Sequence, residues 1–307
     1  MQVIKIYGGL GNQLSQYAFG LAAIRMTNEN ICLDKSFYTA CEWPDFNLDK
    51  LDLSPFSTVS YSERGWAMRQ WAKVRRRLRF PRCSFFKEET PFTVYDMNDI
   101  VRKNRYYDGY FGNYRYYTSV REELSRTVVP NYKIGDEAQK LLSQIVNAKN
   151  SVAIHYRRGD YVSIGCALDN QFYEKAINKV CKTYENPRFF LFSNDMEYAL
   201  EQIEKIRSDI DIVPVVIGKD PHMDVTEFWL MRNCNTFIIA NSTFSWWAAY
   251  LSGHDERVYA PRVRQWTENI YPDGWIIDDA PIQGDPSTYK DEYSESKADA
   301  EANIKNT

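Results

Sequence analysis

Cysteine and histidine are both scarce in this chain of 307 residues, which has six cysteines and three histidines. The cysteines are scattered and none forms a CxxC pair, so we expect neither a structural zinc site nor a disulfide framework. An excess of positive charge is missing as well, because the formal net charge is -3 at pH 7. The overall charge therefore gives no reason to expect a nucleic acid as a partner.

Long apolar runs are also lacking near the start of the chain. It opens with MQVIKIYGG, which is too short and too polar for a signal peptide or a membrane-spanning helix. We therefore expect a cytoplasmic protein. What the chain does contain, 44% hydrophobic and 15% aromatic residues, is enough to build the cores of about two domains.

Two segments show the alternation of strands and helices that is typical of a parallel sheet. Residues 2–34 predict a short strand, a glycine turn, a helix and the strand ICLD, the opening of a Rossmann-like domain. From residue 151 to residue 261, predicted strands and helices follow each other in strict alternation. We predict an α/β protein with two Rossmann-like domains, residues 1–148 and 149–282, followed by a polar, mobile tail over residues 283–307.

Basic residues are concentrated in one segment, because residues 63–82 contain eight arginines or lysines and a single acid. The spacing of Ala67, Trp71, Val74 and Leu78 predicts an amphipathic helix over about residues 64–82. Its basic face is either a solvated surface or a surface that binds an anionic membrane or partner.

Aromatic residues and glycines are dense in YYDGYFGNYRYY, residues 106–117. Exposed aromatic faces suit the apolar C–H faces of sugar rings, and a tyrosine-rich turn in a core explains the same letters. Both interpretations stay open at this point.

Polar segments follow four of the predicted strands, and the carboxyl ends of parallel strands form the edge of a sheet where ligands bind. They are GGLGNQ (8–13), HYRRGD (155–160), FSND (192–195) and ANSTFS (240–245). The glycines of the first segment either bring backbone N–H groups to a phosphate or simply make a tight turn. Residues of the last two segments either contact a ligand or cap the helices that follow.

The HYRRGD segment is the hardest to explain by structure alone. A guanidinium group binds phosphate oxygens in a bidentate manner, so Arg157 or Arg158 can neutralise a diphosphate. We expect Asp160 to pair with one arginine and the other arginine to face the ligand. A DID sequence at residues 209–211 resembles a metal-binding DxD, but it precedes a strand instead of following one, so no metal site is predicted there.

Together, GGLGNQLSQYAFG, HYRRGDY, FSND and NSTFSWWAAYLS resemble the bacterial α-1,2-fucosyltransferases, an inverting glycosyltransferase family (family 11) that uses GDP-fucose. The resemblance covers residues 1 to about 280. It implies a GT-B-type fold, with two parallel sheets facing across a cleft and GDP-fucose held mainly by the C-terminal domain. It also implies that L-fucose moves from GDP-β-L-fucose to O2 of a β-galactoside with inversion, in the synthesis of surface glycans such as O-antigen.

The resemblance assigns roles to individual residues. Those expected in catalysis are Arg157, Arg158, Asp160 and Asn12. Those expected to bind GDP-fucose are Gly9, Gly11, Gln13, His155, Asn194, Asp195, Ser242, Thr243, Phe244 and Ser245. Because arginines and helix N-termini carry the charge of the leaving group, no metal or other cofactor is expected.

The expected partners are GDP-fucose, a β-galactoside that is carried by a lipid-linked oligosaccharide, and the inner face of the cytoplasmic membrane. A nucleic acid is not expected. Two rival functions remain: a related α-1,6-fucosyltransferase, which shares an HxRRxD-like loop, and a GDP-sugar-binding protein without catalysis. Neither the acceptor nor a general base is identified by the sequence.

Overall fold

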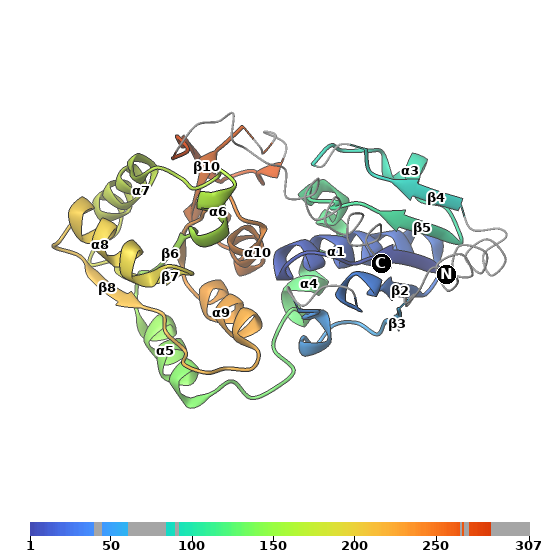
Figure 1. Cartoon of the computed structure of the whole chain (residues 1–307), viewed down its shortest axis with the longest axis horizontal. Coiled ribbons are helices and arrows are strands. Elements are labelled where there is room, and N and C mark those ends of the chain that lie inside the picture. The colour runs from blue at the N-terminus through green and yellow to red at the C-terminus, as the bar shows by residue number, and fades with distance from the viewer. Residues whose placement is uncertain (40–44, 61–83, 90–91, 265, 267–269, 284–307) are drawn as a thin grey trace, which may run out of the picture. The chain divides into compact units, whose positions relative to one another are not determined.

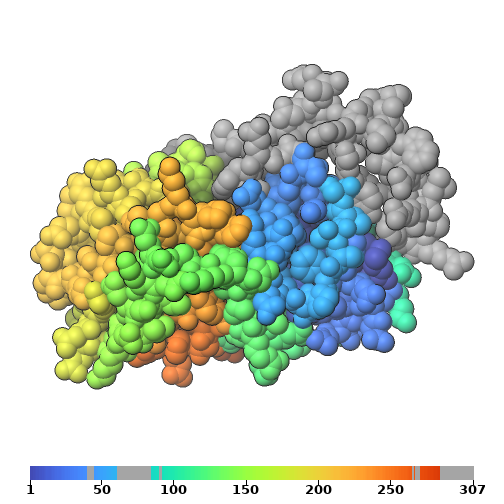
Figure 2. All heavy atoms as spheres, turned by 90° about the horizontal axis from the view of Figure 1, so that it is seen from below, coloured from blue at the N-terminus to red at the C-terminus, as the bar shows by residue number. Residues whose placement is uncertain are grey.

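The computed structural model describes residues 1–39, 45–60, 84–89, 92–264, 266 and 270–283, and these form two compact units (Figure 1). The division falls between Val129 and Pro130 and not at residue 148. The difference arises because helix α5 (Asp136–Asn147), which we assigned to the first domain, packs against helix α9 (Met223–Arg232) of the second unit. Figure 2 shows α5, in green, beside the orange segment around α9. The predicted basic helix at residues 64–82 and the tail from residue 284 lie outside the described residues.

Unit 1 contains a parallel sheet with the order β3-β2-β1-β5-β4 among its described strands. The strands are β1 (Gln2–Lys5), β2 (Ile31–Asp34), β3 (Ser57–Val59), β4 (Ser84–Lys87) and β5 (Arg105–Asp108). The helices are α1 (Leu10–Thr27), α3 (Met97–Ile100) and α4 (Arg121–Thr127). The predicted strand, turn, helix and strand of residues 2–34 are confirmed.

Helix α1 packs closely on the first sheet because Gly20 has no side chain. A Cβ atom at Gly20 would stand 2.5 Å from Ile31 and 2.7 Å from Ile4. Leu14, Tyr17 and other apolar side chains of α1 are fully buried. This packing fixes the glycine turn between β1 and α1 at the carboxyl edge of the sheet.

Unit 2 contains a parallel sheet with the order β11-β10-β9-β6-β7-β8 among its described strands. The strands are β6 (Ser151–Tyr156), β7 (Arg188–Ser193), β8 (Asp211–Pro214), β9 (Thr236–Ile238), β10 (Val258–Arg262) and β11 (Ile276–Asp279). Besides α5 and α9, the helices are α6 (Gly159–Ser163), α7 (Asn170–Thr183), α8 (Met196–Ile206) and α10 (Thr243–Ser252). The alternation predicted from residue 151 to residue 261 is confirmed, and β11 is a strand that we did not predict.

The core of unit 2 explains why the HYRRGD segment is firmly placed. All six residues of β6 are buried, and β6 lies between β9 and β7 in the sheet. The ring of Tyr156, its last residue, stacks on Tyr173 of α7 with the ring centroids 4.4 Å apart. The chain therefore leaves the buried strand at one fixed point.

No helix in the described part of the chain is long and apolar enough to cross a membrane.

Candidate active site

The loop that follows β6 holds a tight pair of opposite charges. Nη2 of Arg157 lies 2.8 Å and 2.9 Å from the two carboxylate oxygens of Asp160, which is in the first turn of α6. The guanidinium carbon of Arg157 also lies 5.2 Å from the centroid of the Tyr161 ring. These two contacts hold the guanidinium group of Arg157 in one place at the carboxyl edge of the sheet.

Arg158 is held by a different set of partners. Its Nε lies 3.2 Å from Oδ2 of Asp195, which follows β7. Its guanidinium carbon lies 3.5 Å from the centroid of the Tyr198 ring, and its Nη1 donates to Gln283 over 3.2 Å. We expected Asp160 to pair with one arginine, and Arg157 confirms this. The adjacent strand β7 also brings Asp195 to Arg158, a pair that the sequence did not predict.

Asn194 joins the two loops at this edge. Its Oδ1 accepts a hydrogen bond of 2.9 Å from the backbone N–H of Arg158. Asp195 occupies the N-cap position of α8, and its side chain makes no capping bond. The interpretation of FSND as a simple helix cap is therefore excluded by the structure. The side chains of Asn194 and Asp195 are instead used to hold the arginine loop.

His155 is buried in the second unit, with 5% of its surface exposed. Burial, with a smaller contribution from the positive charge of Arg157, lowers the pKa of His155 to about 3, so that the imidazole is neutral near pH 7. Its Nδ1 is buried and has no hydrogen-bond partner among the described residues. The ring lies beside Phe244 of α10, with the centroids 5.8 Å apart.

The ANSTFS segment leads from β9 into α10. Ser242 is the N-cap residue of α10 and its side chain makes no capping bond, so plain helix capping does not explain its hydroxyl group. Thr243 and Phe244 are half-buried at the first positions of the helix. Ser245 is fully buried, and its hydroxyl group donates to the carbonyl oxygen of Ser242 over 3.3 Å. The contact of the Ser245 side chain with a ligand, which we expected, stays a prediction.

Glu227 on α9 is a charged group of this region that no sequence motif indicated. Its side chain is half-buried. Burial, together with the negative charge of Asp224, raises the pKa of Glu227 to about 7, and the positive charge of Arg157 opposes this change. The electrostatic coupling links α9 to the arginine loop. The only sequence signal was a carboxylate on an otherwise apolar stretch of a predicted helix.

In unit 1 the GGLGNQ segment forms the turn between β1 and α1. Gly9 is the N-cap residue of α1 and Asn12 is half-buried in its first turn. Gln13 is fully buried: its amide nitrogen donates to the carbonyl oxygens of Gly8 and Asp45, and its Oε1 accepts from the N–H of Asn47. The protein's own backbone thus bonds both ends of the amide, and the contact of Gln13 with the donor stays a prediction. Gly11 is likewise buried.

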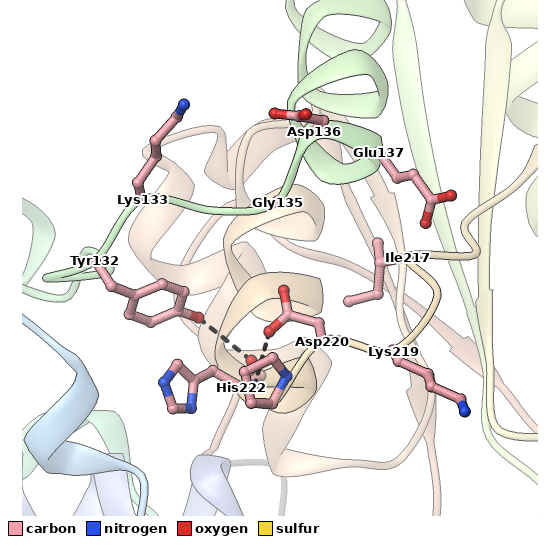
Figure 3. A pocket seen from close by; sticks show the side chains of 10 residues that line it. Tyr132, Lys133, Gly135, Asp136, Glu137, Ile217, Lys219, Asp220 and His222 are labelled. Carbon is pink, nitrogen blue, oxygen red and sulfur yellow. Dashed lines mark hydrogen bonds between the residues drawn. The ribbon is translucent and has the colours of Figure 1, made fainter.

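A pocket of about 500 Å³ lies in unit 2, between the segment that precedes α5 and the loop that follows β8 (Figure 3). Figure 3 shows Tyr132 directed toward the Asp220–His222 segment, and its hydroxyl group donates to the carbonyl oxygen of His222 over 3.3 Å. The lining has charges of both signs and contains none of the residues predicted from the sequence. It consists of Tyr132, Lys133, Gly135, Asp136, Glu137, Ile217, Lys219, Asp220, Pro221 and His222.

A family model described as glycosyl transferase family 11 matches residues 2–277. Among curated proteins, an α-1,2-colitosyltransferase of Escherichia coli is 32% identical over 262 residues, which are 82% of this chain and 88% of that protein. A galactoside α-(1,2)-fucosyltransferase 2 of Rattus norvegicus is 28% identical over 265 residues, which are 83% of this chain and 68% of that protein.

Among solved structures, the fucosyltransferase NodZ from Bradyrhizobium superposes with a TM-score of 0.52 at 14% sequence identity. The alignment covers 81% of this chain and 92% of that one. At this level of identity the likeness concerns the fold alone. Together with the two parallel sheets, it confirms the α/β, GT-B-type fold class predicted from the sequence.

Proposed function

The chain belongs to glycosyl transferase family 11 and is a glycosyltransferase, and from this premise we propose that it transfers L-fucose from GDP-β-L-fucose to O2 of a β-galactoside with inversion. The observation that carries the proposal is the fixed arginine pair at the carboxyl end of β6. Arg157 and Arg158 are adjacent in the chain, are each held by a carboxylate and an aromatic ring, and lie at the sheet edge where ligands of parallel sheets bind.

In this proposal the arginine loop binds the diphosphate of the donor. Arg157 contacts the β-phosphate and the sugar, and Arg158 and Asp160 fix the shape of the loop. A diphosphate competes for a guanidinium that already has a carboxylate partner, so binding exchanges one ion pair for another and costs little rearrangement. Ser242, Thr243 and the N-terminal N–H groups of α10 lie at the neighbouring strand end and contribute further donors to the phosphates.

The guanine base needs acceptors for its N1–H and amino groups and a donor for its carbonyl oxygen. Asp195 and Glu227 offer carboxyl groups in this region besides Asp160, and the neutral imidazole of His155 is a further polar group there. Phe244 gives an apolar surface beside the imidazole. We assign the guanine to this part of unit 2.

The reaction is a single displacement. O2 of the galactose attacks C1 of the fucose, the bond from C1 to the β-phosphate oxygen breaks, and its electron pair leaves with GDP. The proton of the hydroxyl group passes to a base or to solvent. Arg157 and the N-terminus of α10 stabilise the charge on the leaving diphosphate, so we propose that the transfer needs no metal ion.

A second donor is favoured by one specific observation, the 32% identity to an α-1,2-colitosyltransferase over most of both chains. Colitose is fucose without the hydroxyl group at C3. A site that hydrogen-bonds this hydroxyl rejects the deoxy sugar strongly, whereas an apolar site accepts both sugars. Which of the two sugars the protein transfers therefore depends on whether it contacts C3 of the sugar with a polar or an apolar group.

The experiment that tests the proposal is product formation by the purified protein with each of the two donors, in the presence of EDTA. The acceptors are a panel of β-galactosides, and the linkage of the product is read by NMR. Fucose at O2 of galactose supports the proposal. Transfer from GDP-colitose alone means that the donor is GDP-colitose and not GDP-fucose. A product linked at O6 supports the α-1,6 reaction. Donor binding without transfer to any galactoside supports the non-catalytic alternative. Loss of transfer in EDTA contradicts metal independence.

The proposed setting is the synthesis of surface glycans such as O-antigen on lipid-linked acceptors at the inner face of the cytoplasmic membrane. The basic segment at residues 64–82 supports this setting by its charge.

A further inference from the structure

A buried carboxylate in unit 1 holds one particular turn of the chain. Glu88 follows β4 and has 5% of its surface exposed. Its Oε2 accepts hydrogen bonds from the backbone N–H groups of Tyr110 (2.7 Å) and Phe111 (3.0 Å), which lie just after β5. Oε1 is buried without a hydrogen-bond partner among the described residues. Burying a carboxylate to bind two backbone groups is costly, which indicates that the turn it holds has a role.

The turn has little conformational freedom. Phe111 has a φ of 49°, in the left-handed region that side chains rarely adopt. A Cβ atom at Gly109 would stand 2.5 Å from Cβ of Glu88, so only glycine fits beside the carboxylate. Such a backbone persists where its surroundings impose it, and it is concentrated at functional sites. The turn therefore holds the residue between Gly109 and Phe111 in one fixed orientation.

That residue is Tyr110, whose side chain is half-buried. The ring of Tyr7, at the end of β1, braces it edge-on, with the centroids 5.0 Å apart and the planes at 69°. Further rings continue along the same edge of the sheet: Tyr7 to Phe37, Phe37 to Tyr38 and Tyr38 to Phe46, with centroid distances of 6.2, 5.2 and 5.6 Å. We call Tyr110, Tyr7, Phe37, Tyr38 and Phe46 the aromatic row.

The aromatic row differs from the aromatic core of the same unit. Phe19 and Phe111 of the core are fully buried, whereas four rings of the row, those of Phe37, Tyr38, Phe46 and Tyr110, are only half-buried. The fifth ring, Tyr7, is 6% exposed and connects Tyr110 to Phe37. The row follows the carboxyl ends of β5, β1 and β2, and the hydroxyl group of Tyr38 donates to the carbonyl oxygen of Gly8 in the glycine turn. Half-exposed rings at a ligand-binding edge are suited to the apolar faces of pyranose rings, with polar groups beside them for the hydroxyl groups.

We propose that the aromatic row is the acceptor subsite, on which the pyranose rings of a galactoside-terminated oligosaccharide stack, and that Glu88 is a positioning residue for Tyr110. The inference rests on the proposed function and deepens it. Three neighbouring strands span about 10 Å, so the row is long enough for more than one sugar ring. A β-galactosyl disaccharide is therefore a better acceptor than a methyl β-galactoside.

The test compares Tyr110→Ala, Tyr110→Phe, Glu88→Ala and Glu88→Gln with the wild type. The matched control is Phe85→Ala, because Phe85 is 59% exposed and stacks on Tyr106 in the same sheet without belonging to the row. Acceptor KM, donor KM and kcat are measured with lactose as the probe, and binding of lactose in the presence of GDP is measured by saturation-transfer NMR.

Loss of one stacked ring should raise the acceptor KM about three- to tenfold in Tyr110→Ala, with the donor KM unchanged. Tyr110→Phe keeps the ring and should stay within about twofold of the wild type. Glu88→Ala should raise the acceptor KM as Tyr110→Ala does, and Glu88→Gln, which keeps one oxygen to accept from the turn, should restore most of the binding. A structural role alone would lower thermal stability and kcat without this separation of the two KM values.

An unchanged acceptor KM in Tyr110→Ala, or an equal rise in Phe85→Ala, overturns the inference. If the wild type transfers no sugar from either donor, the proposed function fails instead. The NMR measurement still decides about the row in that case: loss of the lactose signal in Tyr110→Ala supports the inference, and absence of lactose binding to the wild type contradicts it. Phe37→Ala is a second variant of the row, for use if Tyr110→Ala does not fold.

Discussion

Replacing Gly159 by alanine tests whether the arginine loop is set by its link to the β7 loop. Gly159 has a φ of +36°, and a Cβ atom there would stand 2.2 Å from Nδ2 of Asn194. That contact is too short to persist. Asn194 is exposed, so its side chain can rotate away, but its Oδ1 then no longer accepts from the N–H of Arg158.

Two contributions to the free energy can be separated. A left-handed backbone costs a residue with a side chain about 1–2 kcal/mol, and an exposed hydrogen bond is worth about 1 kcal/mol. Gly253, the C-cap of α10, has a φ of +82°, and a Cβ atom there would meet nothing within 4 Å. Gly253→Ala therefore has the free-energy cost of the left-handed backbone but displaces no neighbouring side chain, so it is a matched control.

We expect Gly253→Ala to lower Tm by about 2–6 °C, and Gly159→Ala to lower it further because it also loses a hydrogen bond. Only Gly159→Ala should also weaken the binding of GDP-fucose, by about three- to tenfold, because the lost hydrogen bond positions Arg158. Thermal unfolding and isothermal titration calorimetry measure the two quantities. If Gly159→Ala binds the donor as tightly as the wild type, the link to Asn194 does not set the loop. If Gly253→Ala weakens binding equally, the effect belongs to overall stability.

Two further predictions concern single charged groups. Arg158→Lys keeps the positive charge but loses the planar stack on Tyr198 and the forked guanidinium group that reaches both Asp195 and Gln283. Calorimetry should therefore show that the variant binds GDP-fucose about tenfold more weakly than the wild type. Equal affinity would mean that the charge alone suffices. Burial raises the pKa of Glu88 from 4.5 to about 7, so the folded state binds the proton of this carboxyl group more tightly than the unfolded state does. The bound proton therefore stabilises the fold fully below pH 4.5, and this stabilisation is lost as the pH rises through 7. Glu227 and His155 titrate in both proteins, so the test is the difference between wild type and Glu88→Gln: urea unfolding should show the stability of the wild type relative to the variant falling by roughly 3 kcal/mol over this range, and a constant difference would contradict the raised pKa.

The sequence predicted the elements of unit 2 well because their patterns are strong. The sequence predicts a helix over residues 196–206 because its apolar residues recur at helical spacing, and this helix is α8. Asp209 and Asp211 lie in the loop and the strand that follow it. Unit 1 was harder, because β4 and β5 are only four residues long and are rich in aromatic side chains that occur equally in turns. Strand β11, IIDD, has no alternating pattern, and its pairing with β10 makes it a strand.

The candidate site was predictable in its location and not in its contacts. The rule that ligands bind at the carboxyl ends of parallel strands located the loops of Arg157 and Asn194 from the sequence alone. Which carboxylate pairs with Arg158 depends on β6 and β7 being neighbours, and no spacing in the chain contains that information. For the same reason the bonds of Gln13 to Asp45 and Asn47 were not predictable, because they join segments that are more than thirty residues apart.

The two halves of the proposed reaction are fixed by separate sets of contacts. Arg157 and Arg158 are held by Asp160, Asp195 and Gln283, all in unit 2, so the donor site keeps its geometry whatever happens in the aromatic row. The row is held by Glu88 and the glycine turn, both in unit 1. Since residues without shared partners behave additively, a double variant of Arg158→Lys and Tyr110→Ala should lose donor and acceptor affinity by the product of the single effects. A loss far from that product would mean that the two sets of contacts depend on each other.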